Sequence, residues 1–140
     1  MARSRTRTTP AVEHILILDS GAVIAVARGD QRARAFLERA YDLGVQVEVP
    51  VVVVAETVRT PGPRSAPVNR VLRKVRIPAA TEELGRIAGS LLAAASSAAT
   101  VDALVVAQAV AAGGADVLTS DPGDLTALAQ NSPEVVIQSL

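Results

Sequence analysis

Four consecutive apolar residues near the start of the chain are followed at once by an acid, and this restricts the folds available to it. Residues 15–18 are all Ile or Leu, which is typical of a short strand buried on both faces of a parallel sheet. Asp19 comes next. Ligands of parallel α/β sheets bind in the crevice beyond the carboxyl ends of the strands. We therefore expect Asp19 to lie at such a crevice.

Strand-like and helix-like segments alternate along the rest of the chain. Hydrophobic spacing and turn residues predict strands at 14–19, 45–49, 115–119 and 135–137, and helices at 20–28, 31–43, 51–58, 82–94, 101–112 and 125–130. A loop over 60–67, a short helical turn over 68–74 and a minor strand over 75–77 are also predicted. Asp30, Thr81 and Thr100 are the expected helix N-caps. This alternation predicts an α/β fold, with a parallel sheet and helices on both of its faces.

Length and composition favour one domain with a substantial core. The chain has 140 residues, 49% of them hydrophobic, and a formal net charge of zero. It has no cysteine, which excludes disulfides and thiolate sites. No segment reaches the roughly 18 apolar residues of a membrane span, so we expect a cytoplasmic protein without a membrane partner. We expect residues 1–12 to form a basic flexible tail, or an arm that touches a polyanion. Residues 13–140 are expected to form a single domain.

Several acids fall where this architecture brings distant segments together. Asp19 and Asp121 each follow a buried strand, Glu56 lies in the helix after the second strand, and Asp102 lies in the first turn of a later helix. Asp124 stands three residues beyond Asp121. Crowded carboxylates repel one another, and a hard divalent cation such as Mg²⁺ or Mn²⁺ relieves that repulsion.

Each acid also has an ordinary structural explanation. Asp19 could cap the helix that follows it, and Asp102 could simply suit a helix dipole. Glu56 interrupts an apolar segment and could pair with Arg59 on the same helix. Asp121 and Asp124 could serve a turn and a helix start. A metal site therefore requires that the acids act together.

Four segments together resemble the PIN-domain ribonucleases, in particular the VapC-type toxins of bacterial toxin–antitoxin pairs. They are 15–21 with Asp19, Val54–Thr57, Val101–Ala107 and Leu118–Leu125. The resemblance covers about residues 14–140. It implies a three-layer α/β/α sandwich with a parallel sheet, hydrolysis of RNA by metal-activated water with Mg²⁺ or Mn²⁺, and a cognate antitoxin.

The resemblance also assigns roles to individual residues. It implies that Asp19, Glu56, Asp102 and Asp121 are catalytic metal ligands and that Asp124 is an accessory ligand. Ser20, Thr119 and Ser120 would lie around them and orient an acid or a water. One position departs from the family pattern: many members carry a hydroxyl or amide two residues after the first Asp, where this chain has Gly21.

An acidic site needs help to hold RNA, and a basic segment offers it. Residues 57–81 contain no acid, and they contain six cations: Arg59, Arg64, Arg70, Arg73, Lys74 and Arg76. They could hold phosphates beside the site. The same cations could instead form a solvated helix face or a surface for an acidic antitoxin. The small apolar residues of 23–26 and 88–95 suit a homodimer or antitoxin interface, or ordinary core packing.

Other functional classes fit the sequence less well. A phosphoacceptor signalling domain needs a lysine beyond a later strand, whereas the one lysine here is Lys74. A phosphatase of the haloacid-dehalogenase type needs a second Asp where Gly21 stands. A non-catalytic interaction module with the same fold remains an alternative, although the four acids argue against it.

Overall fold

The computed structural model describes residues 14–140, so the predicted tail over 1–12 lies outside the part that can be compared. The elements are β1 (Ile15–Leu18), α1 (Ser20–Ala27), α2 (Gln31–Asp42), β2 (Gln46–Glu48), α3 (Val51–Thr57), a 3₁₀ helix η1 (Pro63–Ser65), α4 (Ala66–Leu72), α5 (Glu82–Ala95), α6 (Thr100–Ala111), β3 (Ala115–Thr119), α7 (Gly123–Leu128) and β4 (Val135–Ser139).

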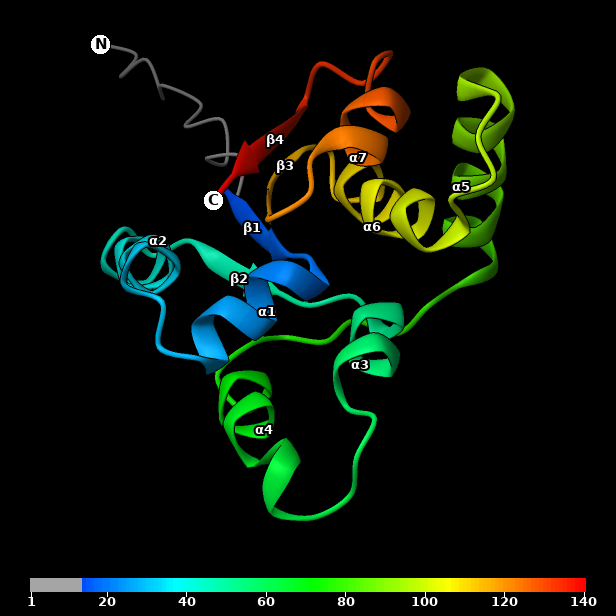
Figure 1. Cartoon of the computed structure of the whole chain (residues 1–140). Coiled ribbons are helices and arrows are strands. Elements are labelled where there is room, and N and C mark those ends of the chain that lie inside the picture. The colour runs from blue at the N-terminus through cyan, green and yellow to red at the C-terminus, as the bar shows by residue number, and fades with distance from the viewer. Residues whose placement is uncertain (1–13) are drawn as a thin grey trace, which may run out of the picture.

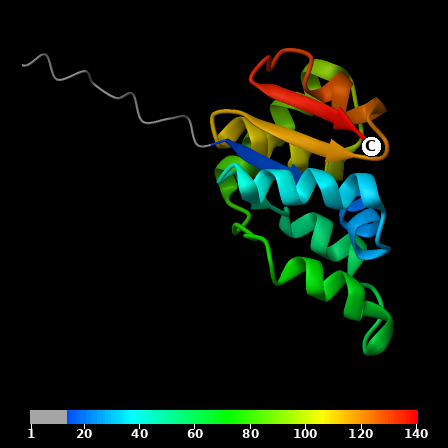
Figure 2. The ribbon, with the colours of Figure 1, turned by 90° about the vertical axis from the view of Figure 1, so that its left-hand side faces the viewer.

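The four strands form one parallel sheet in the order β2-β1-β3-β4. In Figure 1, α1 and α2 lie on one side of this sheet, whereas α6 lies on the other with α5 outside it. The predicted α/β/α architecture is thus confirmed. Figure 2 shows β3 and β4 running in the same direction, with their arrowheads on the side of the molecule where α1 begins.

The core lies at the two central strands and the helix that covers them. Ile17, Leu18, Val117 and Leu118 are fully buried, and each such side chain contributes about 1.5–3 kcal/mol through removal of its surface from water. Half of the residues of α6 are also buried. An apolar surface all round is what a helix needs between a sheet and a further helix.

Local signals identified two of the three predicted helix starts. The Asp30 carboxylate accepts from the Ala33 N–H at 2.9 Å, and the Thr81 hydroxyl accepts from the Leu84 N–H at 3.1 Å. The third prediction is wrong, because Thr100 is the first residue of α6 and Ala99 is its N-cap, without a side-chain cap.

The region after α3 differs from the prediction in two details. Helix α4 begins at Ala66 rather than near residue 68, because a proline is tolerated in a first helical turn. The minor strand predicted at 75–77 is reduced to a single bridge between Arg76 and Glu48.

Helix α7 begins two residues earlier than predicted, so that Asp124 lies inside its first turn rather than before it.

Within residues 14–140, no single helix is long and apolar enough to span a membrane; α5 and α6 reach that length and composition only as a pair, which is bent by 116°.

Candidate active site

The site begins where the two central strands end. The Asp19 N–H donates to the Leu118 carbonyl at 3.0 Å, which fixes the end of β1 against the end of β3. The chain leaves β1 for β2 on one side, and β3 pairs with β1 on the other. Such a reversal of strand order is where open α/β sheets bind their ligands. The strand ends therefore lie at a suitable place for a ligand site.

Asp19 is buried, with 6% of its surface exposed. Its Oδ2 accepts a hydrogen bond from the Thr119 hydroxyl at 3.0 Å. Its Oδ1 is buried and has no hydrogen-bond partner among the described residues. Although Asp19 occupies the N-cap position of α1, its side chain makes no capping hydrogen bond, so the simple explanation as a cap fails. A buried carboxylate oxygen without a donor is costly, and a cation would relieve that cost.

Thr119 joins the first and fourth acids. It is 1% exposed, and its hydroxyl oxygen accepts from the Asp121 N–H at 3.0 Å while its hydrogen is donated to Asp19. The sequence suggested that Thr119 orients the fourth acid or a water. In the structure, its hydroxyl contacts the side chain of the first acid and the backbone N–H of the fourth.

Asp102 shows that the acids lie in one region. Burial raises its pKa to about 6, and the charges of four other carboxylates contribute to that rise, in decreasing order those of Asp19, Asp124, Glu56 and Asp121. These are the five acids that the sequence singled out. They lie directly after β1, in α3, in α6 and between the end of β3 and the first turn of α7, so the fold brings together positions far apart in the chain.

The five carboxylates do not form a preorganised ligand set. Within residues 14–140, no three Asp, Glu or His side chains lie close enough to hold a metal ion together. Asp19 is buried, Glu56 and Asp102 are half-buried, and Asp121 and Asp124 are exposed. The donor set nevertheless suits Mg²⁺ or Mn²⁺, which prefer carboxylate oxygens and retain several waters.

Within residues 14–140, Glu56 does not form the ion pair with Arg59 that would give it a purely structural role. In the described part of the chain, the one ion pair joins Arg86 to Glu82. Glu56 is therefore not paired with Arg59, and its charge is among those that raise the Asp102 pKa.

Three small residues stand beside the first acid. Ser20 begins α1 and is half-buried, and Ser120 is exposed directly after β3. Gly21 lies in the first turn of α1, in contact with the Ser120 side chain. The residues that follow the first strand and those that follow the third thus meet at this edge of the sheet.

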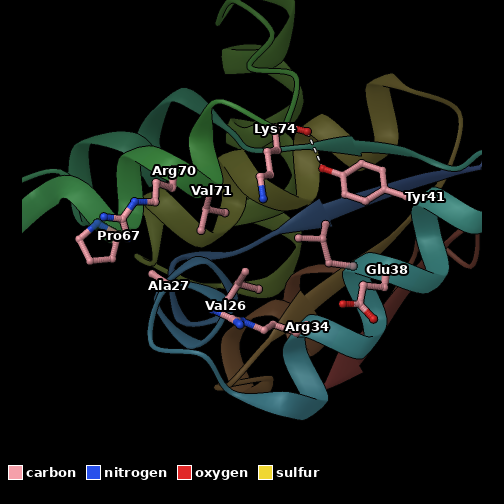
Figure 3. A pocket seen from close by; sticks show the side chains of 10 residues that line it. Val26, Ala27, Arg34, Glu38, Tyr41, Pro67, Arg70, Val71 and Lys74 are labelled. Atoms are coloured by element: carbon pink, nitrogen blue, oxygen red, sulfur yellow. Dashed lines mark hydrogen bonds between the residues drawn. The ribbon is translucent and has the colours of Figure 1, made fainter.

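The six predicted RNA-binding cations are all exposed: Arg59, Arg64, Arg70, Arg73, Lys74 and Arg76. Only two of them line the same hollow. Arg70 and Lys74 line a hollow of about 330 Å³ between α1, α2 and α4. Figure 3 shows Arg34 and Glu38 on its α2 side. The Tyr41 hydroxyl donates to the Lys74 carbonyl and links α2 to the end of α4.

The sequence missed two features. Arg34 adds a cation to the hollow of Arg70 and Lys74 from a helix that seemed merely amphipathic. Glu48, within the strand predicted at 45–49, is 5% exposed and accepts a hydrogen bond from Gln108 Nε2 at 3.1 Å. No local signal indicates this pair, because Gln108 belongs to α6, sixty positions away.

The apolar segments considered for an interface contribute to the core. Val23, Val26 and Ala88 are buried within it, and Leu91 and Leu92 are half-buried against it. Core packing therefore accounts for these side chains.

Comparisons with known proteins agree with this geometry. A family model described as the PIN domain matches residues 16–130. No curated protein matches the sequence. Among solved structures, the chain is similar to VapBC2 from Rickettsia felis bound to a DNA fragment from their promoter, with a TM-score of 0.72 and 14% identity, covering 90% of this chain and 98% of that one.

Two further structures show the same fold. VapBC-1 from nontypeable Haemophilus influenzae gives a TM-score of 0.66 at 14% identity, covering 89% of this chain and 97% of that one. A toxin–antitoxin complex from Klebsiella pneumoniae gives 0.64 at 16% identity, covering 89% and 99%. At such low identities, these likenesses concern the fold.

Proposed function

Because this chain belongs to the PIN-domain family, we propose that it is a divalent-metal-dependent endoribonuclease and the toxin of a toxin–antitoxin pair. The observation that carries this proposal is the state of Asp19. Its buried Oδ1 lacks a hydrogen-bond donor, and it lies near Asp102, whose pKa is raised to about 6 by burial and by four surrounding carboxylates. A cation bound beside such a cluster would relieve the repulsion between its carboxylates.

The proposed ligands of Mg²⁺ or Mn²⁺ are Asp19, Glu56, Asp102 and Asp121, with Asp124 as an accessory. A cation bound there would supply Lewis-acid chemistry, by acidifying a water and polarising a phosphodiester. The chain contributes the placement of the carboxylates. Thr119 occupies one oxygen of Asp19 and thereby fixes its orientation, while the other oxygen keeps its full capacity to accept.

RNA contact is proposed for the six cations between α3 and α5. Arg59 is three residues beyond Glu56, so this basic segment starts beside the acids. Arg70 and Lys74 share their hollow with Arg34, and only Glu38 among its lining residues is acidic. Positive charge on this segment would offset the repulsion between phosphates and carboxylates, and would hold RNA without reading its sequence.

An antitoxin is the proposed protein partner. Its support is the likeness of the fold to chains in a toxin–antitoxin complex and in two VapBC structures. A homodimer is proposed as the assembly of the toxin itself. Co-purification with a small partner encoded beside this chain would test the pairing directly.

Two conservative substitutions test the nuclease. Asp19→Asn and Asp102→Asn keep side-chain volume and remove one carboxylate each, and Asp42→Asn does the same at the exposed end of α2. Cleavage of single-stranded RNA in Mn²⁺ should fall by about 100-fold or more in the first two variants and stay unchanged in the third. EDTA should abolish cleavage by the wild type.

Binding of the cation gives a second measurement. Mn²⁺ should raise the thermal unfolding temperature of the wild type and of Asp42→Asn, because a ligand of the folded state stabilises it. Asp19→Asn should lose that shift. Wild-type cleavage by Asp19→Asn would refute the metal mechanism, and a folded wild type that cuts no RNA in any divalent cation would favour the interaction-module alternative.

A further inference from the structure

Gly21 stands where the backbone does not require a glycine. It is the second residue of α1 and does not have a positive φ, unlike the glycines at several turns. Glycine is among the poorest helix formers, so the conformation alone would favour another residue. The reason for Gly21 must lie in its surroundings.

Those surroundings leave little room for a side chain while the Ser120 hydroxyl keeps its position. A Cβ added to Gly21 would overlap the Ser120 hydroxyl oxygen, and it would lie 3.0 Å from the Ser120 Cβ and 3.3 Å from the Ser120 nitrogen. Both backbones are anchored, because Gly21 lies in a helix and Ser120 directly follows β3. The missing side chain at 21 therefore creates the space in which the Ser120 hydroxyl lies.

The Ser120 hydroxyl is available to a ligand. Ser120 is exposed, and no hydrogen bond from its hydroxyl is found within residues 14–140. Its neighbour Thr119 is committed to Asp19, whose Oδ1 is buried and unpartnered. Ser120 thus adds an exposed neutral donor to a region rich in carboxylate acceptors.

We propose that Ser120 contacts the substrate, donating its hydroxyl hydrogen to a non-bridging phosphate oxygen of the phosphodiester that is cleaved, and that Gly21 is the residue that makes room for it. This inference rests on the proposed nuclease function. A phosphate approaching five carboxylates gains from uncharged donors as well as from a cation, because carboxylates can only accept. A donor aimed at charge that develops in the transition state acts mainly on kcat.

The direct test removes only the hydroxyl. Ser120→Ala should lower kcat for RNA cleavage by about 100-fold, with little change in KM, in the thermal unfolding temperature or in its shift by Mn²⁺. If Ser120 had only a structural role, Ser120→Ala would lower the thermal unfolding temperature and would not lower kcat selectively over KM. Ser90→Ala on α5, whose hydroxyl is also exposed, serves as the matched control.

An exchange of the two side chains tests the place of the hydroxyl. Gly21→Ser alone sets two side chains in one space, and Ser120→Gly alone removes the hydroxyl, so both should lose activity. The double variant Gly21→Ser/Ser120→Gly returns a hydroxyl to the same space from the helix. Its kcat should exceed that of either single variant by about 10-fold or more, because the two changes are coupled.

The outcomes separate the two proposals. Wild-type kcat in Ser120→Ala, while Asp19→Asn is inactive in the same assay, overturns the role of Ser120 and leaves the nuclease standing. An exchange variant no better than the single variants also overturns it. Full activity in Asp19→Asn, or none in the wild type, overturns both.

Discussion

The Thr119 hydroxyl donates to Oδ2 of Asp19 at 3.0 Å, so the end of β3 holds the carboxylate that follows β1. One residue thereby couples two neighbouring strands to the acid between them. The bond is buried, and it leaves the second carboxylate oxygen without a protein partner among the residues described, 14–140.

Thr119→Val should destabilise the fold. Valine keeps the shape of threonine but removes the donor to a buried carboxylate, and hydrogen bonds to charged groups contribute about 1.5–3 kcal/mol. The free energy of unfolding in urea should fall by about that amount. Thr126→Val, an exposed change on α7, should stay within about 0.5 kcal/mol of the wild type; equal effects of the two substitutions would contradict the assignment.

Asp102 should make stability depend on pH in a defined direction. Its pKa is raised from 3.8 to about 6 in the folded protein, so the folded state binds more protons between those values, and the free energy of unfolding falls as the pH rises through them. Asp102→Asn should escape this loss. In EDTA, its stability relative to the wild type should therefore grow between about pH 4 and pH 7, by on the order of 1 kcal/mol because solvent screens a partly exposed group. A constant difference would contradict the prediction.

Arg70 and Lys74 should contribute to RNA affinity through charge. In an Asp19→Asn background, which we expect not to cleave RNA, Arg70→Gln/Lys74→Gln should weaken binding of single-stranded RNA. The slope of log Kd against log salt should fall by about 0.7 for each phosphate that the variant no longer neutralises, as measured by fluorescence anisotropy. Arg32→Gln/Arg39→Gln removes the same amount of charge from α2, outside the lining of the hollow, and should have a smaller effect. Equal effects would place the RNA away from the hollow.

The stability of the fold should depend more on the hydrogen bond between Gln108 and Glu48 than on the negative charge of Glu48. Gln108→Leu leaves the Glu48 carboxylate without its amide donor, which costs about 1–3 kcal/mol of stability. Glu48→Gln removes the buried charge and keeps a hydrogen-bonding side chain, so its cost should be lower. Urea unfolding of both variants decides this, and a larger loss in Glu48→Gln would show that the charge itself stabilises the fold.

The strand–acid patterns predicted much of the fold. Apolar runs before Asp19 and before Ser120 identified β1 and β3, and the rule that parallel strands share a carboxyl edge placed the acids together. The same reasoning identified the helix after Pro50, despite its four valines, because that proline suits a first turn.

Side-chain relationships were beyond such reasoning, because they depend on how elements face one another. Nothing local indicates that Thr119 turns toward Asp19 or that Gln108 reaches Glu48. Gly21 was seen only as a departure from a pattern, since the contact with Ser120 that explains it spans almost a hundred positions. The expected cap at Thr100 was wrong by one residue, as helix boundaries often are.

The strand order has a consequence for the timing of activity during synthesis. β1 is made before the other strands, yet its partner β3 comes about a hundred residues later, and Asp19 gains its hydrogen bond only from that distant strand. Such long-range pairing forms late compared with local helices. A growing chain on the ribosome carries Asp19 and Glu56 through most of translation without Asp102 or Asp121. The proposed nuclease therefore completes nearly all of this domain before its candidate metal ligands can come together.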